Sequence, residues 1–313
     1  MQAEDFNRPA SGAYADLDAL IALRFPARQI DIRRRRRALS RMSGGNRANV
    51  RGRGIDFDEV RSYQPGDDIR AIDWRVTART GAAHTKLYHE ERERPVLIAV
   101  DQRAGMFFGS SHCFKSVLAA HLAALVTWSA LHCGERVGGV VFSDAGHRDI
   151  RPRRSRKTAL GLLSTIVDFN RRLRAPGSDS GDGFADMLAM CRRIARPGAS
   201  LVIVSDFDGL LQQRAQEHLF QLSRHVELTA LHCTDALEHQ LPPPGEYAVT
   251  DGVQRSTLST TAGSLRRHYA SDAGDYHAAI ADALQRVGVP CRMARTQDSP
   301  FELLQCLYGS ARP

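Results

Sequence analysis

Short apolar runs alternate with longer helical segments in the second part of the chain. Runs rich in valine, isoleucine and leucine predict buried strands. The predicted strands cover residues 96–100, 136–143, 200–206, 226–233 and 290–295. The predicted helices cover residues 114–131, 156–170, 183–195, 210–224 and 264–287, and a short one begins at residue 300. This alternation predicts an α/β fold with a doubly wound, mostly parallel sheet covered on both faces.

The pattern also divides the chain into three regions. Residues 1–15 are rich in small and polar types, which predicts a disordered N-terminus. Residues 16–92 predict a small region of N-terminal helices followed by short strands and turns, and residues 93–309 predict the large α/β domain. Within these regions we expect helices over 16–23 and 27–42, an irregular glycine-rich segment over 43–54, and a hairpin over 247–259 that turns at Asp251 and Gly252.

Composition is that of an ordinary globular protein. Hydrophobic residues make up 42% of the 313 residues and charged residues 25%. No apolar run approaches the roughly 18 residues needed to span a bilayer, and the polar N-terminus lacks a signal core, so we expect a cytoplasmic protein without a membrane contact. The 6 cysteines are widely spread without a C-x-x-C pair, which predicts reduced thiols rather than disulfides or a zinc site.

The net charge of +8 is concentrated in two arginine-rich runs, at residues 33–37 and 151–157. Such runs make nucleic-acid binding an alternative to consider. Aromatic residues are only 7% of the chain, so rings on which bases could stack are scarce. We therefore expect these runs to be solvated or to face a protein partner.

Two aspartates follow predicted strands, and one has an arginine close by. Asp101 ends the strand at 96–100, Asp206 ends the strand at 200–206, and Arg103 stands two positions after Asp101. In a doubly wound sheet, sites form beyond the carboxyl ends of the strands, so the two carboxylates are expected to face one crevice. A buried carboxylate needs a cation or several donors, and Arg103 can supply the cation.

Several strings resemble one bacterial family, and the resemblance covers most of residues 50–309. They are "RGRGIDFDEVRSYQPGDDIRAIDWRVTAR" (51–79), "HEERERPVLIAVDQRAGM" (89–106), "GERVGGVVFSD" (134–144) and "LVIVSDFDG" (201–209). The chain resembles the family catalogued as domain of unknown function 58. That resemblance implies a fold similar to von Willebrand factor A domains over residues 93–309. It also implies association with a MoxR-type AAA+ ATPase, as an adaptor or co-chaperone.

The same resemblance implies a degenerate metal-ion-dependent adhesion site. The A-domain pattern D-x-S-x-S falls on Asp101, Arg103 and Gly105, so both serines are missing, and the later aspartate falls on Asp206. The loop that should bring a threonine, near residues 178–184, has none.

Three arrangements of this crevice are open. Arg103 can fill the cation's place and pair with Asp101 and Asp206, which is the arrangement we expect. It can instead point into solvent. In the third, Asp101, Asp206, Asp208 and waters hold a metal, for which Mg²⁺ would be suited. We therefore expect no bound cofactor, with Mg²⁺ disfavoured.

A polar string forms the most specific part of the resemblance. Its residues are Tyr63, Pro65, Gly66, Asp67, Asp68, Arg70, Asp73, Trp74 and Arg79. Pro65 and Gly66 predict a type II turn. Alternation in "AIDWR" predicts a strand with Ile72 and Trp74 on one face and Asp73 on the other. Paired acids and arginines suggest a lattice that fixes this loop to a neighbouring domain.

Catalytic templates are absent from the sequence. It has no G-x-x-x-x-G-K-[ST] phosphate loop, no H-E-x-x-H and no G-x-S-x-G. We therefore expect a non-enzymatic interaction module whose partners are the ATPase and an unknown client. One alternative is a metal-dependent hydrolase that uses Asp67, Asp68 and Asp73, or Asp101 and Asp206. The other is a nucleic-acid binder that uses the arginine runs.

Overall fold

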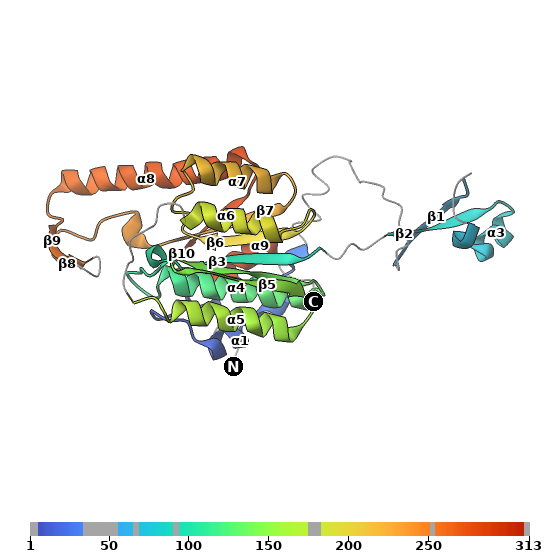
Figure 1. The fold of residues 1–313 in the computed structure, drawn as a ribbon, viewed down its shortest axis with the longest axis horizontal. Helices are drawn as coiled ribbons and strands as arrows, with labels where there is room; N and C mark the ends of the chain where they lie inside the picture. Colours follow the sequence, from blue (N-terminus) through green and yellow to red (C-terminus); the bar gives the residue numbers. More distant parts are fainter. Residues whose placement is uncertain are drawn as a thin grey trace. The chain divides into compact units, whose positions relative to one another are not determined.

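The computed structural model describes residues 6–33, 56–64, 69–89, 94–174, 183–250 and 254–309. The chain forms two compact units. The first unit contains residues 1–37 and 94–313, and the second contains residues 38–93. Figure 1 shows the elements of both units.

The first unit is built on a six-stranded sheet. Its strands are β3 (Val96–Asp101), β4 (Val137–Ser143), β5 (Gly146–Arg153), β6 (Ser200–Ser205), β7 (Glu227–Thr234) and β10 (Cys291–Arg295). They lie in the order β10-β7-β6-β3-β4-β5, and every neighbouring pair is parallel except β4 and β5. The predicted doubly wound, mostly parallel α/β sheet is confirmed.

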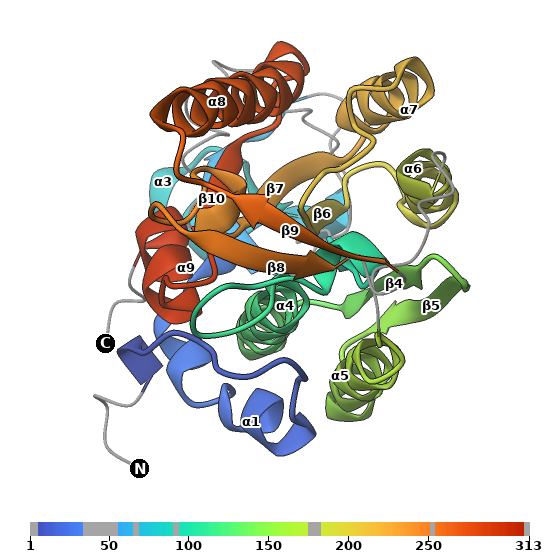
Figure 2. The ribbon, with the colours of Figure 1, turned by 90° about the vertical axis from the view of Figure 1, so that its left-hand side faces the viewer.

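Helices cover both faces of this sheet (Figures 1 and 2). One face carries α1 (Leu17–Ala22), α4 (Lys115–His132), α5 (Arg156–Asn170) and α9 (Pro300–Tyr308), and the other carries α6 (Gly183–Ile194), α7 (Gln213–Ser223) and α8 (Gly263–Arg286). Alternate residues of β3 enter two separate cores: Ile98 packs in the first and Leu97 in the second. Burial on both faces explains why β3 is one continuous apolar run.

The N-terminal segment belongs to this first unit, which corrects two predictions. Residues 6–15 are not disordered: Gly12 pairs with Cys113, and the backbone N–H of Ala15 donates to Asn170 Oδ1 at 2.7 Å. The domain boundary expected at residue 16 is therefore wrong, because the segment before it supplies part of the core. The prediction of disorder was based on composition alone. Composition cannot show that these small residues form hydrogen bonds with residues far away in the sequence.

The next segment contacts α4. Trp128 Nε1 donates to the carbonyl of Leu20 at 3.0 Å, and Ser129 Oγ donates to the carbonyl of Ile30 at 2.7 Å. Helix α1 was predicted over 16–23. The helix predicted over 27–42 begins differently: a 3₁₀ turn, η2 (Pro26–Gln29), is followed by the extended Ile30, and residues 32 and 33 are helical. Residues 34–42, with most of the first arginine run, lie outside the described residues.

The edge strand β5 was not predicted. Its residues read Gly146–Arg153 and are mostly exposed, with arginines and Pro152 among them. It forms an antiparallel hairpin with β4. Because its polar composition lacks an apolar period, the sequence suggested a turn and a basic run at this position. The composition is also typical of an edge strand that resists pairing with another chain.

The second unit is small. It contains β1 (Asp56–Ser62), η3 (Ile69–Ala71), α3 (Trp74–Thr80) and β2 (His84–His89), and β1 pairs antiparallel with β2. The strand predicted through "AIDWR" is wrong, because Asp73 is the N-cap of α3 and Trp74 begins that helix. The predicted turn at residues 65 and 66 lies outside the described residues.

A hairpin and a long helix fill the connection between β7 and β10. The hairpin strands are β8 (Glu246–Thr250) and β9 (Arg255–Ser259), as predicted, with the turn itself outside the described residues. Helix α8 buries Ile280, Ala283 and Leu284, all near its C-terminal end. Its N-terminal end lies beside the hairpin (Figure 2). No helix in the described ranges has the length and apolar content needed to cross a membrane.

Candidate functional site

The candidate site lies where the winding of the sheet reverses. Strands β3 and β6 are neighbours, but the chain leaves β3 toward α4 on one face and leaves β6 toward α7 on the other. This arrangement opens a crevice at the carboxyl ends of the two strands. Asp101 and Asp206 stand at these ends, as the sequence predicted.

Asp101 is fully buried, and the chain supplies its donors. Its Oδ1 accepts the backbone N–H of Arg103 at 2.9 Å, and its Oδ2 accepts Nη2 of Arg103 at 2.9 Å. Nε of Arg103 lies 3.2 Å from both oxygens, and Ser205 Oγ donates to Oδ2 at 2.6 Å. The carboxylate therefore has an opposite charge and further donors without any ion from solution.

The guanidinium of Arg103 lies inside the crevice, with 5% of the residue exposed. Its Nη2 also lies 3.5 Å from Asp206 Oδ1 and donates to the carbonyl of Asp208 at 3.1 Å. The rings of Phe142 and Phe184 lie 5.8 and 5.4 Å from its central carbon. Of the three arrangements that the sequence left open, this geometry is that of an arginine between the two strand ends, not of a side chain in solvent.

A second internal cation, Lys115, was missed by the sequence reasoning. It begins α4, and only 3% of its side chain is exposed. Its Nζ lies 3.1 Å from Asp206 Oδ2 and also bonds to Glu238 Oε1. A lysine at the start of an otherwise apolar helix was the available signal, but such a residue is usually solvated.

These cations determine how the carboxylates titrate. Burial acts to raise the pKa of Asp206, but Lys115 and Arg103 outweigh it and hold that pKa at about 2. Burial raises the pKa of Asp101, with Arg103 opposing the rise. Asp206 and Glu238 raise the pKa of Lys115 despite its burial. Asp206 and Lys115 are therefore both charged at neutral pH.

A pocket of about 310 Å³ opens beside these ion pairs. Asp208 and Glu238 lie on its rim, and the hydroxyl of Tyr276 donates to Asp208 Oδ1 at 3.0 Å. His232 and His277 also line it, with ring centroids 5.2 Å apart. Burial lowers the pKa of each imidazole to about 4, so both are neutral at pH 7.

The loop after β3 is held by Asp144 at the β4–β5 turn. Asp144 Oδ2 accepts the backbone N–H of Ala104 at 2.8 Å, which fixes the turn η4 (Ala104–Met106). Gly105 lies in this turn, and a Cβ there would be 3.3 Å from Asp206 Oδ2. The turn therefore approaches the second carboxylate closely at a position where the A-domain pattern has a serine.

The residues present do not fit a resident Mg²⁺. The two serine positions of the adhesion-site pattern hold Arg103 and Gly105, neither of which offers a side-chain oxygen. The carboxylates that would remain, Asp101 and Asp206, already pair with the chain's own cations. Within the described ranges, no group of three or more His, Cys, Asp or Glu side chains has the arrangement of a metal site.

The polar string lies in the second unit, where its described aspartate, Asp73, holds the start of a helix. Asp73 Oδ1 accepts the N–H groups of Arg75 and Val76 at 3.0 and 3.2 Å, so this carboxylate caps α3. Trp74 is 67% exposed. Backbone pairing holds Tyr63, whose N–H donates to the carbonyl of residue 83 at 2.8 Å.

The string also contains two described arginines and two further aspartates. Arg70 and Arg79 are exposed, and Arg79 lies in the last turn of α3, where a cation favours the helix dipole. Residues 65–68, which include Asp67 and Asp68, lie outside the described residues. In the part of the string that is described, Asp73 caps a helix and Trp74 is exposed.

Comparisons with known proteins match a part of the chain that includes the polar string and the crevice. The profile of the family described as "Protein of unknown function DUF58" matches residues 59–279. Uncharacterized proteins of Mycobacterium tuberculosis and Mycobacterium bovis are each 31% identical over 258 residues, covering 82% of this chain and 79% of theirs.

Solved structures of low identity are also similar. The conserved hypothetical protein BatB from Bacteroides thetaiotaomicron is 13% identical, with 62% of this chain and 98% of that chain covered and a TM-score of 0.33. An aerotolerance-related membrane protein from Bacteroides fragilis is 15% identical (67% and 94% covered, TM-score 0.38). A von Willebrand factor type A protein from Catenulispora acidiphila is 13% identical (72% and 43% covered, TM-score 0.37).

Proposed function

Because the chain belongs to the DUF58 family, and its doubly wound sheet carries a crevice closed by internal ion pairs, we propose that it is a non-enzymatic protein-interaction module. In this proposal it acts with a MoxR-type AAA+ ATPase, as an adaptor or co-chaperone that brings a client protein to the ATPase. The ATPase supplies ATP hydrolysis, and the module works beside it in the cytoplasm.

The observation that carries the proposal is the position of Arg103. A guanidinium bonded to Asp101 and close to Asp206 gives the crevice a permanent cation. Binding at this crevice therefore needs no divalent ion to complete the surface. The exposed carboxylate left at the pocket is Asp208, because Glu238 is paired with Lys115, so the partner is expected to present a lysine or arginine at Asp208.

The engagement of the polar groups supports a non-enzymatic role. Asp101, Asp206, Lys115 and Glu238 are all bonded to one another or to Arg103. A hydrolase that used these carboxylates to hold a metal would first have to break buried ion pairs, and such pairs are costly to separate.

The test is a pull-down with the tagged full chain at moderate salt, with and without EDTA, and identification of partners by mass spectrometry. We expect an AAA+ ATPase in both samples. Asp208→Arg should abolish its capture, because the variant reverses the charge of an exposed rim group without breaking a buried ion pair. Asp149→Arg, at an exposed position of β5, makes the same charge change and should retain the ATPase.

Two outcomes would contradict the proposal. Capture that disappears in EDTA would mean that a metal completes the surface after all. Absence of any ATPase from both samples would remove the adaptor role and reopen the hydrolase and nucleic-acid alternatives.

A further inference from the structure

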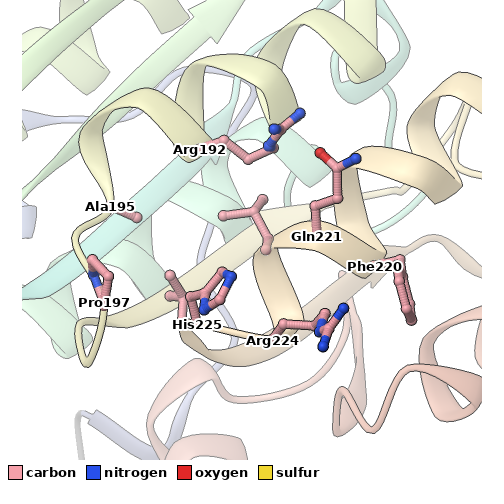
Figure 3. A pocket seen from close by; sticks show the side chains of 9 residues that line it. Arg192, Ala195, Pro197, Phe220, Gln221, Arg224 and His225 are labelled. Carbon is pink, nitrogen blue, oxygen red and sulfur yellow. The ribbon is translucent and has the colours of Figure 1, made fainter.

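A groove lies at the opposite end of the sheet from the crevice. It is lined by the last turns of α6 and α7 and by the segments that lead into the amino ends of β6 and β7. Its volume is about 560 Å³, which is within the range of sites that hold a small ligand or a few side chains. Figure 3 shows Arg192 on one side, with Arg224, His225 and Pro197 on the other.

The groove is basic and has no internal acid. Arg192 and Arg224 both line it, and none of its lining residues is a carboxylate. Within the described residues, neither arginine forms an ion pair with an aspartate or glutamate. Nη1 of Arg192 instead lies 2.9 Å from Nδ1 of His218, and the guanidinium carbon of Arg224 lies 5.9 Å from the Phe220 ring. Two positive charges therefore remain uncompensated.

Apolar groups lie between these charges. Phe220 is 51% exposed at one end of the groove, and Leu222 and Val226 are buried beneath it. Pro197 adds a further apolar wall. A ligand with only negative charge would leave this apolar surface exposed to water, whereas a ligand with an apolar side chain beside a carboxylate would bury it.

A backbone hydrogen bond joins two of the segments that form the groove. The N–H of Gly198 donates to the carbonyl of His225 at 2.8 Å, and Gly198 has φ +83°, a conformation that favours glycine. A site already in its bound shape loses less conformational entropy on binding.

We propose that this groove binds an acidic segment of a partner protein, in which carboxylates flank an aromatic or aliphatic side chain. The carboxylates pair with Arg192 and Arg224, and the apolar side chain packs on Phe220 and Pro197. Arginine is suited to this role because its planar fork binds carboxylates bidentately. The inference does not depend on the crevice, and it gives the module a second surface of opposite charge at the other end of the sheet.

Nucleic acid fits the same groove less well. Phosphates would pair with the arginines, but Phe220 and His225 supply the aromatic rings among the lining residues, and neither Tyr nor Trp is present, whereas single-stranded nucleic acid is usually held by several stacked rings. The apolar floor also has no counterpart in a phosphodiester backbone. A protein segment is therefore the better match.

The test is fluorescence anisotropy with the full chain and a labelled peptide that alternates aspartate and glutamate with phenylalanine and leucine. We expect saturable binding that weakens by about tenfold in Arg192→Glu and in Arg224→Glu, and weakens similarly in Phe220→Ser. Arg151→Glu is the matched control, because it makes the same charge change at an exposed position of β5. Melting temperatures of all variants check that each is folded.

Three results would overturn the inference. The first is no binding of the peptide at low salt up to about 1 mM, the weak end of specific affinities. The second is equal binding of a peptide in which every acid is replaced by its amide. The third is tighter, steeply salt-dependent binding of labelled oligouridylate that the same variants reduce, which would assign the groove to nucleic acid.

Discussion

Replacing Arg103 with methionine should destabilise the first unit, and the loss should depend on pH. The substitution removes the side-chain donors that reach Asp101, while Ser205 Oγ and the backbone N–H of residue 103 remain. The carboxylate of Asp101 is then buried without its cation. Removal of one partner from a buried ion pair costs about 3–5 kcal/mol of the free energy of unfolding.

Protonation of Asp101 limits this cost. Each pH unit above an ordinary aspartate pKa of about 3.9 adds about 1.4 kcal/mol to the cost of keeping the acid neutral. The limit is therefore about 5 kcal/mol at pH 7.5 and about 2 kcal/mol at pH 5.5. In the variant the folded-state pKa of Asp101 is raised, so the folded state binds more protons, and its stability falls as the pH rises through that pKa.

Urea unfolding at both pH values measures this dependence, with the fluorescence of the buried Trp128 as the signal. Asp101→Asn combined with Arg103→Met should recover most of the loss and show little pH dependence, because it removes both charges. Arg151→Met serves as the surface control and should change stability by less than about 0.5 kcal/mol. A single Arg103→Met variant within that same margin at pH 7.5 would refute the assignment of Arg103 to a structural cation.

Further predictions concern acid stability, a helix cap and strand packing. Because the folded pKa of Asp206 is depressed to about 2, its contribution is complete above pH values near 4 and is lost as the pH falls toward 2. Asp206→Asn should therefore flatten the acid limb of a stability–pH curve measured by urea unfolding, and an unchanged limb would contradict the pairing. Asp73→Ala should reduce the stability of α3 by about 1 kcal/mol, whereas Asp73→Asn keeps the N-cap hydrogen bonds. Amide hydrogen exchange over residues 74–80 should therefore be faster in the alanine variant than in the asparagine variant. Gly139→Ala should lower the free energy of unfolding by more than about 3 kcal/mol, because its Cβ would collide with the carbonyl of Ile98. Gly161→Ala in α5 has open space around its Cβ and should raise the free energy of unfolding by up to about 1 kcal/mol. Equal melting temperatures of the two variants would disprove the contact with Ile98.

The central sheet was predictable because burial on both faces imposes a continuous apolar run on each inner strand. Strand β3 shows this clearly, since all its residues are buried. The edge strand β5 has no such constraint, and its polar residues resemble a turn. The sequence at residues 72–74 was ambiguous: alternation favoured a strand, but an aspartate before a helical segment is also an N-cap signal, and capping determined the local structure.

Some residues of the crevice were predictable because the order of strands and loops fixes where they lie. Strand ends place Asp101 and Asp206 together, and Arg103 follows within the same loop. Lys115 and Glu238 could not be assigned, because their contacts join positions 91 and 123 residues apart and depend on the folded connections. The matching of buried charges is a property of the tertiary structure, and a single sequence gives no distances between such residues.

The N-terminal segment has a consequence for the order in which the molecule is made. Residues 6–33 pack against α4 and α5, and the bond between Leu20 and Trp128 spans 108 residues. At a synthesis rate of about 5–20 residues per second, Leu20 waits roughly 5–20 s for this partner to be translated. The second unit lies entirely within that interval and can form its β1–β2 pair first. Residues 6–33 thus reach partners in α4 only after the whole of the second unit has been translated.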